Sequence, residues 1–550
     1  IITHSESGIF KELSWGELRR SVANFKRSLI NVGVGSGDVV AGFVANGYEA
    51  IVCSLASLSL GAIWTSCSPD FGQQGVLDRF GQTNPKVLIV GKTTQYNLKA
   101  IDLTERINLI IRNLPSVTTV FVYEGPNPEI ATQKIARSGC QTLSFCEAID
   151  GEAPLTFIRT HFNAPAFILY SSGTTGPPKC IVHGHGGALI QLAKEHRYHV
   201  DIKPGDRVFF YTTCGWMMWN WLIASLASQA TVITYDGAPF AKGPCTLWDL
   251  CESDKWHIFG TSAKYISSIE KYGYRPGALH SLDSLKAFLS TGSPLSHESF
   301  DFVYEAVKSD LMLGSISGGT DIISCFCLST PIKPVYRGEL QCAGLGLDVD
   351  ILDDEGNSIT GEKGELICRK PFPAMPVKFF GDKDGSKYET TYFSRFDGVW
   401  THGDFAERTE NNGFIIYGRS DTTLNPGGIR IGTAEIYRQV ETIPEVLESM
   451  AVGQRVNNDM RVLLFVVLKE GSHLDSNLER TIKTRVCDNA SPHHVPDVIA
   501  QVPDLPRTVS GKIVELAVQN VIHNEPVRNK EALANPHALE FFKNHPDIRL

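Results

Sequence analysis

The sequence predicts an α/β protein with a large N-terminal domain of parallel-rich sheets and flanking helices, followed by a small, mobile α+β C-terminal domain. The length of 550 residues favours about three to four domains or subdomains. Short apolar runs alternate with helical patterns in the first quarter of the chain, and a glycine-rich stretch near residue 420 separates a shorter second pattern. These observations together predict the fold class and its division.

Apolar runs rich in β-branched residues predict the first strands, at residues 39–44, 62–65, 87–90 and 119–123. Helical patterns lie between them, so we expect βαβ units on a parallel sheet. A further strand at residues 166–170 leads directly into a glycine-rich turn, and a helical pattern begins near Gly187. Strand, loop and helix in this order are typical of a phosphate site at a helix N-terminus.

The domain boundary is expected just after a strand at residues 414–417. Residues 418–432 contain four glycines and Pro426, which is typical of a connecting segment. The sequence therefore predicts a large domain at residues 1–420 and a small one at 421–550. In the small domain the pattern predicts a strand at 462–468, a helix at 478–486, a strand at 498–502 and a helix at 513–521.

Composition excludes several classes of protein. The 51 basic and 60 acidic residues give a net charge of −9 without basic runs, so no nucleic-acid partner is expected. Two uncharged stretches, residues 50–69 and 208–235, are long enough to span a membrane, but their polar residues favour buried elements. Thirteen scattered cysteines without a CxxC pair indicate reduced thiols in the cytosol and no metal cage. The sequence carries no signal of oligomeric state.

One segment, residues 170–179, carries the most chemical information. Its glycines and hydroxyl side chains offer backbone amides and O–H donors, and its lysine adds charge, so polyphosphate is the natural ligand. Pro178 and Cys180 do not fit a P-loop kinase motif. The candidate phosphate-binding residues are Ser171, Ser172, Gly173, Thr174, Thr175, Gly176 and Lys179.

This loop resembles that of the adenylate-forming superfamily, which includes acyl-CoA synthetases, peptide-synthetase adenylation domains and luciferases. The resemblance recurs in the family's order at residues 291–294, 318–321, 401–404, 417–421, 427–430 and 506–512. It implies the adenylate-forming fold, with ATP, Mg²⁺ and CoA as ligands. It also implies a first step that forms an acyl-adenylate and a second step that transfers the acyl group to CoA after a domain rotation.

The resemblance assigns roles to the nucleotide-binding residues. Gly292, Ser293 and Pro294 match the adenine-side loop, and Asp404 has the carboxylate needed to accept two hydrogen bonds from a ribose diol. Thr320 would donate to a phosphate oxygen. Relatives usually have Glu where this chain has Asp321, so either a direct or a water-bridged Mg²⁺ contact is expected.

The resemblance also assigns the catalytic lysine and the hinge. Lys512 follows Ser510 and Gly511, and its ammonium would stabilise charge between the substrate carboxylate and the α-phosphate. The remaining assignments are Asp421 as the hinge, Gly427 and Gly428 as the CoA channel, and Arg419 and Arg430 as contacts to the nucleotide.

Segments at residues 66–72, 214–220 and 535–540 resemble the acetoacetyl-CoA synthetase family, whose members carry an extra segment ahead of what is Ile1 here. In relatives that activate acetate, a Trp stands at the position of Gly318, so we expect extra space for a longer acid. The expected acyl pocket consists of Trp216, Met217, Met218, Thr291 and Gly318.

Three alternatives stay open on the sequence alone. A propionate or butyrate ligase would satisfy the Gly318 argument equally well. A catalytically silent binding protein would keep the fold, although Lys512, Asp404 and the phosphate loop are intact. A luciferase-like oxygenase would share the adenylation step.

Overall fold

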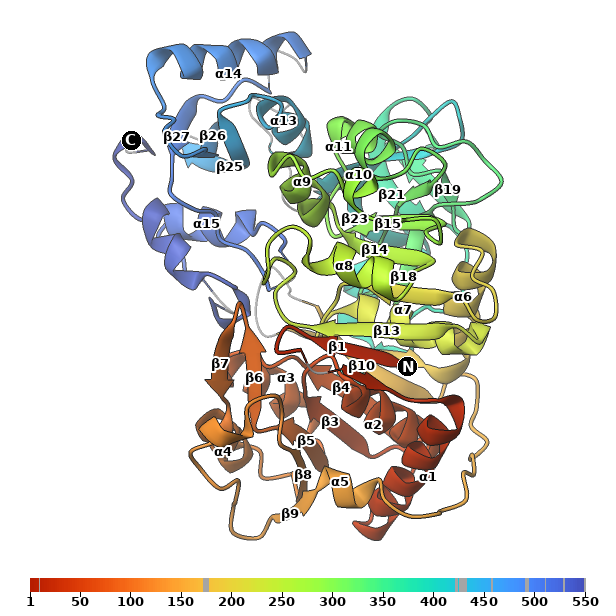
Figure 1. Ribbon diagram of the computed structural model, residues 1–550. Helices are drawn as coiled ribbons and strands as arrows, with labels where there is room; N and C mark the ends of the chain where they lie inside the picture. Colours follow the sequence, from red (N-terminus) through yellow and green to blue (C-terminus); the bar gives the residue numbers. More distant parts are fainter. Residues whose placement is uncertain are drawn as a thin grey trace.

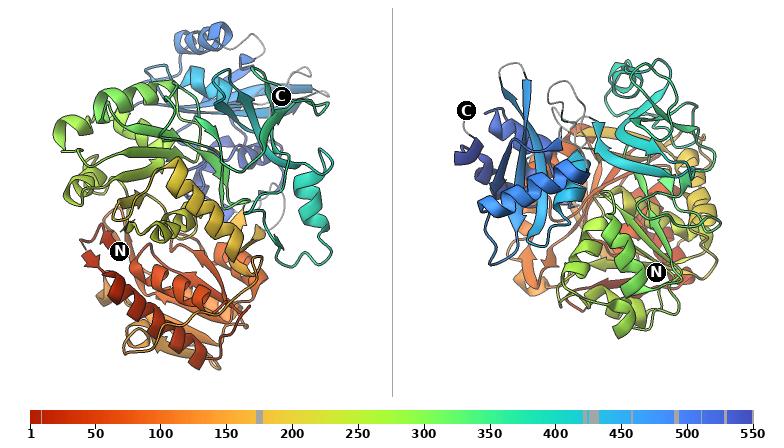
Figure 2. Two further views of the ribbon diagram at one scale, coloured as in Figure 1. Left: turned by 90° about the vertical axis from the view of Figure 1, so that its right-hand side faces the viewer. Right: turned by 90° about the horizontal axis from the view of Figure 1, so that it is seen from above.

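The computed structural model confirms the expected α/β class (Figure 1). It describes residues 1–8, 10–171, 178–420, 424, 433–456, 459–489, 494–509, 511–527 and 530–548. The right-hand view of Figure 2 shows the small C-terminal domain, in blue, beside the large domain. The described part of the large domain contains two large parallel-rich sheets, two smaller antiparallel sheets and a two-stranded hairpin.

An eight-stranded sheet contains all the strands predicted in the first 170 residues. Its order is β22-β11-β10-β4-β3-β5-β8-β9, and the pairs from β10 to β9 are parallel. Strands β3, β4, β5 and β8 are buried along their whole length, which explains their continuous apolar runs. The strands are β3 (Val39–Phe43), β4 (Ile63–Cys67), β5 (Val87–Gly91), β8 (Thr119–Tyr123), β9 (Gln141–Ser144), β10 (Pro165–Ser171), β11 (Lys179–Gly184) and β22 (Lys378–Phe379).

Helices cover this sheet as the sequence predicts. They are α1 (Trp15–Asn31), α2 (Tyr48–Ser59), α3 (Gln73–Thr83), α4 (Thr104–Asn113) and α5 (Phe145–Ala148). Helix α1 begins where it does because Ser14 and Glu17 form a reciprocal capping box. The Ser14 hydroxyl accepts from the Glu17 amide at 3.2 Å, and the Glu17 carboxylate accepts from the Ser14 amide at 2.8 Å. A hairpin of β6 (Thr93–Tyr96) and β7 (Lys99–Asp102) projects beside α4.

The expected strand, loop and helix arrangement at the phosphate loop is wrong. Strand β10 is followed by a second strand, β11, which pairs with it antiparallel from Ser171 opposite Lys179 to Pro165 opposite Gly184. Helix α6 (His185–Lys194) begins only after β11, at the opposite end of the hairpin. The loop therefore joins two strands, and α6 does not direct its N-terminus at the phosphate site.

A seven-stranded sheet forms the second half of the large domain. Its order is β16-β15-β14-β12-β13-β1-β2, antiparallel only between β1 and β2. The strands are β1 (Ile2–Ser5), β2 (Phe10–Glu12), β12 (Arg207–Phe210), β13 (Thr231–Asp236), β14 (Ile258–Ser262), β15 (Ala287–Thr291) and β16 (Met312–Ser315). Its helices are α7 (Met217–Ala224), α8 (Thr246–Ser253), α9 (Ala263–Lys271), α10 (Pro276–Leu279) and α11 (His297–Phe302).

Two antiparallel sheets complete the large domain. A three-stranded sheet contains β17 (Ser317–Gly319), β18 (Ser324–Leu328) and β19 (Cys342–Ala343). A four-stranded sheet contains β20 (Val349–Leu352), β21 (Lys363–Cys368), β23 (Trp400–Arg408) and β24 (Phe414–Arg419). Helix α12 (Ser386–Phe393) packs against β23. Gly318, Asp404 and Arg419 lie on these short strands, and Thr320 and Asp321 lie between β17 and β18.

The small domain is a three-stranded sheet with helices. It contains α13 (Thr433–Val440), β25 (Val446–Val456), β26 (Asp459–Leu468), α14 (Ser476–Asn489), β27 (Val498–Gln501) and α15 (Glu515–Ile522). The sequence missed α13 and β25. We propose a domain division at residues 420 and 421, because the hydrophobic clusters before and after this point share no residue. Helix α9 of the large domain lies beside the small domain (Figure 1), where Lys271 donates to the Leu447 carbonyl.

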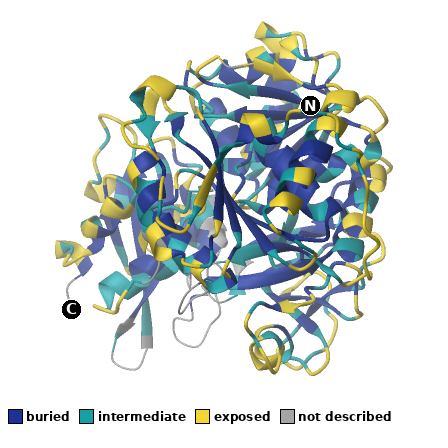
Figure 3. Cartoon of the chain, turned by 90° about the horizontal axis from the view of Figure 1, so that it is seen from below, coloured by how far each residue is buried: buried dark blue, intermediate teal, exposed yellow. Residues whose placement is uncertain are grey.

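The two long uncharged stretches are buried parts of the large domain. The first forms α2 and β4, and the second forms β12, α7 and β13. Figure 3 shows the strands at the centre of the molecule as largely buried. In the described part of the chain, no helix is both long and apolar enough to cross a bilayer. All thirteen cysteines are free thiols.

Candidate active site

Strand β11 holds the turn between β17 and β18 at two points. The Lys179 ammonium lies 2.9 Å from Asp321 Oδ1, and His183 Nε2 lies 2.9 Å from the Thr320 carbonyl oxygen. Because a carbonyl only accepts, His183 Nε2 is the donor. Burial lowers the pKa of His183 to about 4, so the imidazole is neutral at physiological pH. The structure thus joins the end of the phosphate loop to the candidate magnesium residue.

Asp321 receives a second hydrogen bond, from a residue that the sequence did not indicate. The Tyr392 hydroxyl of α12 donates to Asp321 Oδ1 at 2.6 Å, and the Tyr392 ring stacks on Trp400 with centroids 3.7 Å apart. Burial by itself raises the pKa of Asp321, but Lys179 and Tyr392 outweigh it and bring this pKa below its usual range. Asp321 is therefore a carboxylate, held in one orientation.

Asp404 lies close to this group on β23. It is 6 % exposed, its Oδ2 lies 3.6 Å from His402 Nε2, and it stands opposite Arg419 in the β23–β24 ladder. A Cβ atom added at Gly319 would lie 3.8 Å from His402 Nε2, so the 318–321 and 401–404 segments meet here. The structure brings together the candidate ribose, phosphate and metal residues from both segments.

Trp216 and the 291–292 turn also meet. A Cβ atom added at Gly292, where φ is +91°, would lie 4.0 Å from Trp216 Cζ2. The Thr291 hydroxyl donates to the Ile316 carbonyl at 2.9 Å, which ties the end of β15 to the start of β17. Ser293 and Pro294 are exposed. These contacts bring Trp216 close to the turn that follows β15. That Trp216 and Thr291 line an acyl pocket, on opposite walls, remains a prediction.

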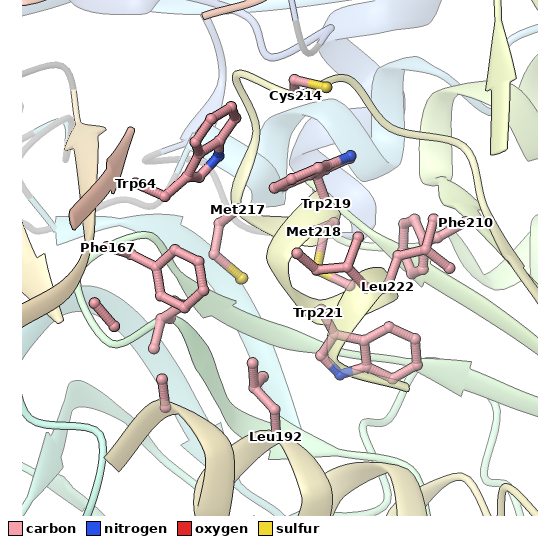
Figure 4. Packing of buried hydrophobic residues seen from close by; sticks show 14 of the residues in the cluster. Trp64, Phe167, Leu192, Phe210, Cys214, Met217, Met218, Trp219, Trp221 and Leu222 are labelled. Carbon is pink, nitrogen blue, oxygen red and sulfur yellow. The ribbon is translucent and has the colours of Figure 1, made fainter. Parts of the chain in front are cut away.

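Met217 and Met218 are core side chains in this structure. They are 5 % and 1 % exposed and lie in the large hydrophobic cluster with Trp64, Phe167 and Trp221 (Figure 4). Burial of this kind is what ordinary core residues show. Their place in an acyl pocket remains a prediction.

The expectation that Gly318 leaves open space is wrong for this backbone. A Cβ atom at Gly318 would lie 2.2 Å from the Ser324 carbonyl oxygen and 2.3 Å from Cys325 Cα, so the backbone of β18 fills that direction. Glu195, which is completely buried, supports β18 from behind by accepting from the Ser324 hydroxyl and from the Cys325 amide. Gly318 allows close approach of two strands, and any contact with an acyl group would come from its backbone.

Lys512 stands on a tight turn of the small domain. The Lys512 amide donates to Thr508 Oγ1 at 3.1 Å, the Thr508 amide donates to the Lys512 carbonyl at 2.8 Å, and Gly511 has φ of +81°. Lys512 is exposed. Only glycine adopts the Gly511 conformation readily, which explains the Ser-Gly-Lys pattern.

Several predicted site residues lie outside the described residues. They are Ser172, Gly173, Thr174, Thr175, Gly176, Asp421, Gly427, Gly428 and Arg430. The backbone of Arg419 pairs with Asp404, but its side chain is not described. Their expected roles remain predictions.

Tyr392, His183 and Glu195 act through contacts that the sequence did not reveal. His183 shares a face of β11 with Lys179, four residues away, and strand periodicity would have shown this if β11 had been recognised. Tyr392 and Glu195 reach partners 71 and 129 residues distant, and no local pattern encodes such pairs.

The described residues contain no group of three or more His, Cys, Asp or Glu side chains placed to hold a metal ion. Asp321 alone fits a cation that arrives with a nucleotide, because Mg²⁺ is commonly held by one or two carboxylates together with substrate phosphates. The contact of Asp321 with Mg²⁺ in a nucleotide complex remains a prediction.

Comparison with protein families gives two matches. The model described as AMP-binding enzyme matches residues 4–376, and the model described as AMP-binding enzyme C-terminal domain matches residues 438–512.

Individual relatives match over almost the whole chain. An acetoacetyl-coenzyme A synthetase of Rhizobium meliloti is 51 % identical over 549 residues, which cover 100 % of this chain and 84 % of the relative. The acetoacetyl-CoA synthetase of Danio rerio is 43 % identical over 98 % of this chain and 81 % of its own. The solved acetoacetyl-CoA synthetase of Streptomyces lividans superposes with a TM-score of 0.91, at 38 % identity, covering 98 % of this chain and 83 % of that one.

Replacing Gly318 by Ala should destabilise the β17–β18 pair, because the new methyl group meets the β18 backbone at 2.2 Å. We expect a loss of about 1–3 kcal/mol in the free energy of unfolding, measured by thermal or urea denaturation. Gly319→Ala is the matched control, since its methyl group would meet nothing closer than 3.8 Å. Equal stability of the two variants would contradict the close-approach explanation.

Proposed function

This chain belongs to the AMP-binding enzyme family, and from that premise we propose that it joins acetoacetate to CoA, using ATP and releasing AMP and pyrophosphate. The observation that supports the substrate most strongly is the full-length likeness to acetoacetyl-CoA synthetases of bacterial and vertebrate origin. A shared fold alone does not set a substrate, whereas this likeness extends through the segments expected around the acyl group.

The first half-reaction forms the acyl-adenylate. A carboxylate oxygen of acetoacetate attacks the α-phosphorus of ATP, and the bond to pyrophosphate breaks. Such a step depends chiefly on positioning and charge neutralisation. Lys179 and Asp321 neutralise each other at 2.9 Å before the nucleotide binds. When MgATP binds, the ammonium would turn to a phosphate oxygen and leave the Asp321 carboxylate in place to face the cation, while Asp404 would accept hydrogen bonds from the ribose hydroxyls.

Tyr392 keeps Asp321 in place during this exchange of partners. Its hydroxyl bond of 2.6 Å does not depend on Lys179, and stacking on Trp400 fixes its ring. The carboxylate therefore needs no reorientation when the lysine leaves. Preorganisation of this kind is an effective source of transition-state stabilisation.

The second half-reaction transfers the acyl group to CoA. The thiolate of CoA attacks the carbonyl carbon of the adenylate, and AMP leaves. We assign Lys512 to the first half-reaction and Gly427 and Gly428 to the CoA channel, with Asp421 as the hinge between the two domain orientations. The position of Lys512 supports this assignment, because the residue is exposed and stands on a tight turn that could approach a site on the large domain and withdraw without unfolding.

The acid is tested by exchange of labelled pyrophosphate into ATP with acetate, propionate, butyrate, acetoacetate and a long-chain fatty acid. We expect kcat/KM for acetoacetate to exceed that for butyrate about tenfold or more, because a site that hydrogen-bonds the keto group rejects an acid that lacks it. Equal exchange with butyrate or propionate would instead indicate a general short-chain ligase. No exchange with any acid would indicate a binding protein, and oxygen-dependent light emission would indicate luciferase-like chemistry.

Replacing Lys512 by Ala should reduce pyrophosphate exchange about 100-fold or more, because the charge that stabilises the transition state is lost. Thioester formation from preformed acetoacetyl-adenylate should stay within about threefold of the native rate, since Lys512 acts before that step. Lys483→Ala is the matched control, because Lys483 pairs with Glu479 on the surface of α14. An unimpaired first half-reaction in Lys512→Ala would overturn the assignment.

Replacing Tyr392 by Phe should raise KM for MgATP about tenfold, the effect of one hydrogen bond to a charged group. KM for acetoacetate should change little. The control is Tyr388→Phe, which removes a hydroxyl from the same helix and the same aromatic cluster. If both variants behave alike, the Tyr392 hydroxyl does not position Asp321.

A further inference from the structure

A bulge in β23 shapes the turn that carries Asp404. Across the β21–β23 ladder, Glu365 stands opposite Phe405 and Ile367 opposite Thr401. One residue of β21 therefore faces three residues of β23, numbers 402–404. Gly403, at the centre of these, has φ of +80°. Extra residues in a bulge lose their ladder partners, and bulges often direct a side chain into a functional site.

The Glu365 side chain replaces the ladder partner that the bulge removes. Its Oε1 accepts from the Gly403 amide at 2.9 Å. The same oxygen accepts from the Ser420 hydroxyl at 3.2 Å, just after β24. One carboxylate oxygen thus holds the centre of the bulge and the end of the neighbouring strand.

The second oxygen of Glu365 is engaged separately. Its Oε2 pairs with Arg395 at 2.5 Å, and Arg395 also pairs with Asp354 at 2.9 Å. Glu365 is completely buried. Burial raises the pKa of Glu365 to about 7, although Arg395 opposes this shift, while nearby Asp404 adds to it. Arg395 therefore favours the charged form of this acceptor against the effect of burial.

We infer that Glu365 is the positioning residue of the ribose-binding turn: it fixes the backbone of Gly403 and thereby directs the Asp404 carboxylate at the nucleotide. The inference rests on the proposed function, because it takes Asp404 as the residue that binds the ribose hydroxyls. Glu365 itself touches no substrate. Its loss should therefore be seen as a loss of recognition of the ribose rather than of the acid.

The kinetic preference for ATP over its 2′-deoxy and 3′-deoxy analogues measures directly how well the Asp404 carboxylate is placed. A well-placed carboxylate favours a nucleotide with both hydroxyls, because the deoxy analogues leave a buried acceptor without a partner. A carboxylate that is free to turn loses this preference. The readout is the ratio of kcat/KM for ATP to kcat/KM for each analogue, which a general loss of stability does not change.

Glu365→Gln is the first variant. The amide supplies one acceptor oxygen where the carboxylate uses two, so either Gly403 or Arg395 loses its partner. We expect kcat/KM for ATP to fall about 10- to 100-fold and the preference for ATP over the deoxy analogues to fall by about the same factor, with KM for acetoacetate unchanged. Glu365→Asp keeps the charge but shortens the reach of the side chain. If the Gln variant does not fold, we expect the same fall in kcat/KM and in the preference for ATP from Glu365→Asp.

Two further variants separate the possible outcomes. Asp354→Asn weakens the exposed end of the ion-pair network and should keep the native preference. Asp404→Ala should abolish the preference. If Asp404→Ala abolishes it while both Glu365 variants keep it, the positioning role is overturned and the proposed function stands. If Asp404→Ala keeps it, Asp404 is not the ribose ligand, and the inference falls together with that part of the proposed function.

Discussion

The ion pair between Lys179 and Asp321 is the contact on which the rest of the site depends. It joins residues 142 positions apart in the chain and two different sheets, since Lys179 begins β11 of the eight-stranded sheet and Asp321 follows β17. Tyr392 bonds to the same carboxylate oxygen, and its ring connects the pair to β23 through Trp400. Together with the bond from His183 to the Thr320 carbonyl, this pair ties β11 to the turn between β17 and β18.

Much of the fold was predictable because buried parallel strands leave a strong local signal. The runs that became β3, β4, β5 and β8 are largely apolar, and most are rich in β-branched residues. Strand β11 was missed because it begins with a lysine directly after two prolines and runs directly into a helical pattern.

The candidate site was predictable only as a set of motifs. The motifs identify Lys179, Asp321 and Asp404 as site residues, but they do not show where the neighbouring backbone leaves space for a side chain or a ligand. At Gly318 the sequence correctly indicates a missing side chain, whereas only the β17–β18 register shows that the backbone of β18 fills its place. The roles of Tyr392 and Glu365 could not be predicted from the sequence, for another reason. Their importance comes from partners on other strands, and such pairings have no period in the sequence.

Two buried carboxylates share one structural role. Glu195 holds the amide of Cys325 on β18, and Glu365 holds the amide of Gly403 on β23. Burying a charge is costly, and a buried ion pair seldom returns more stability than a well-packed apolar pair. At each of these positions, a regular strand ladder would be more stable than a buried carboxylate bonded to a backbone amide.

These carboxylates stand where the ladders are irregular or close, at the bulges of β17 and β23 or directly beside them. A carboxylate has two oxygens that accept bonds in several directions, so it can satisfy backbone amides and side chains that no neighbouring strand reaches. The structure is therefore less stable at these points, but the backbone can adopt bulged conformations that a regular β-sheet does not allow. The segments that carry Asp321 and Asp404 have such shapes, and this explains why these two residues lie in or beside the short antiparallel sheets rather than on the regular parallel strands.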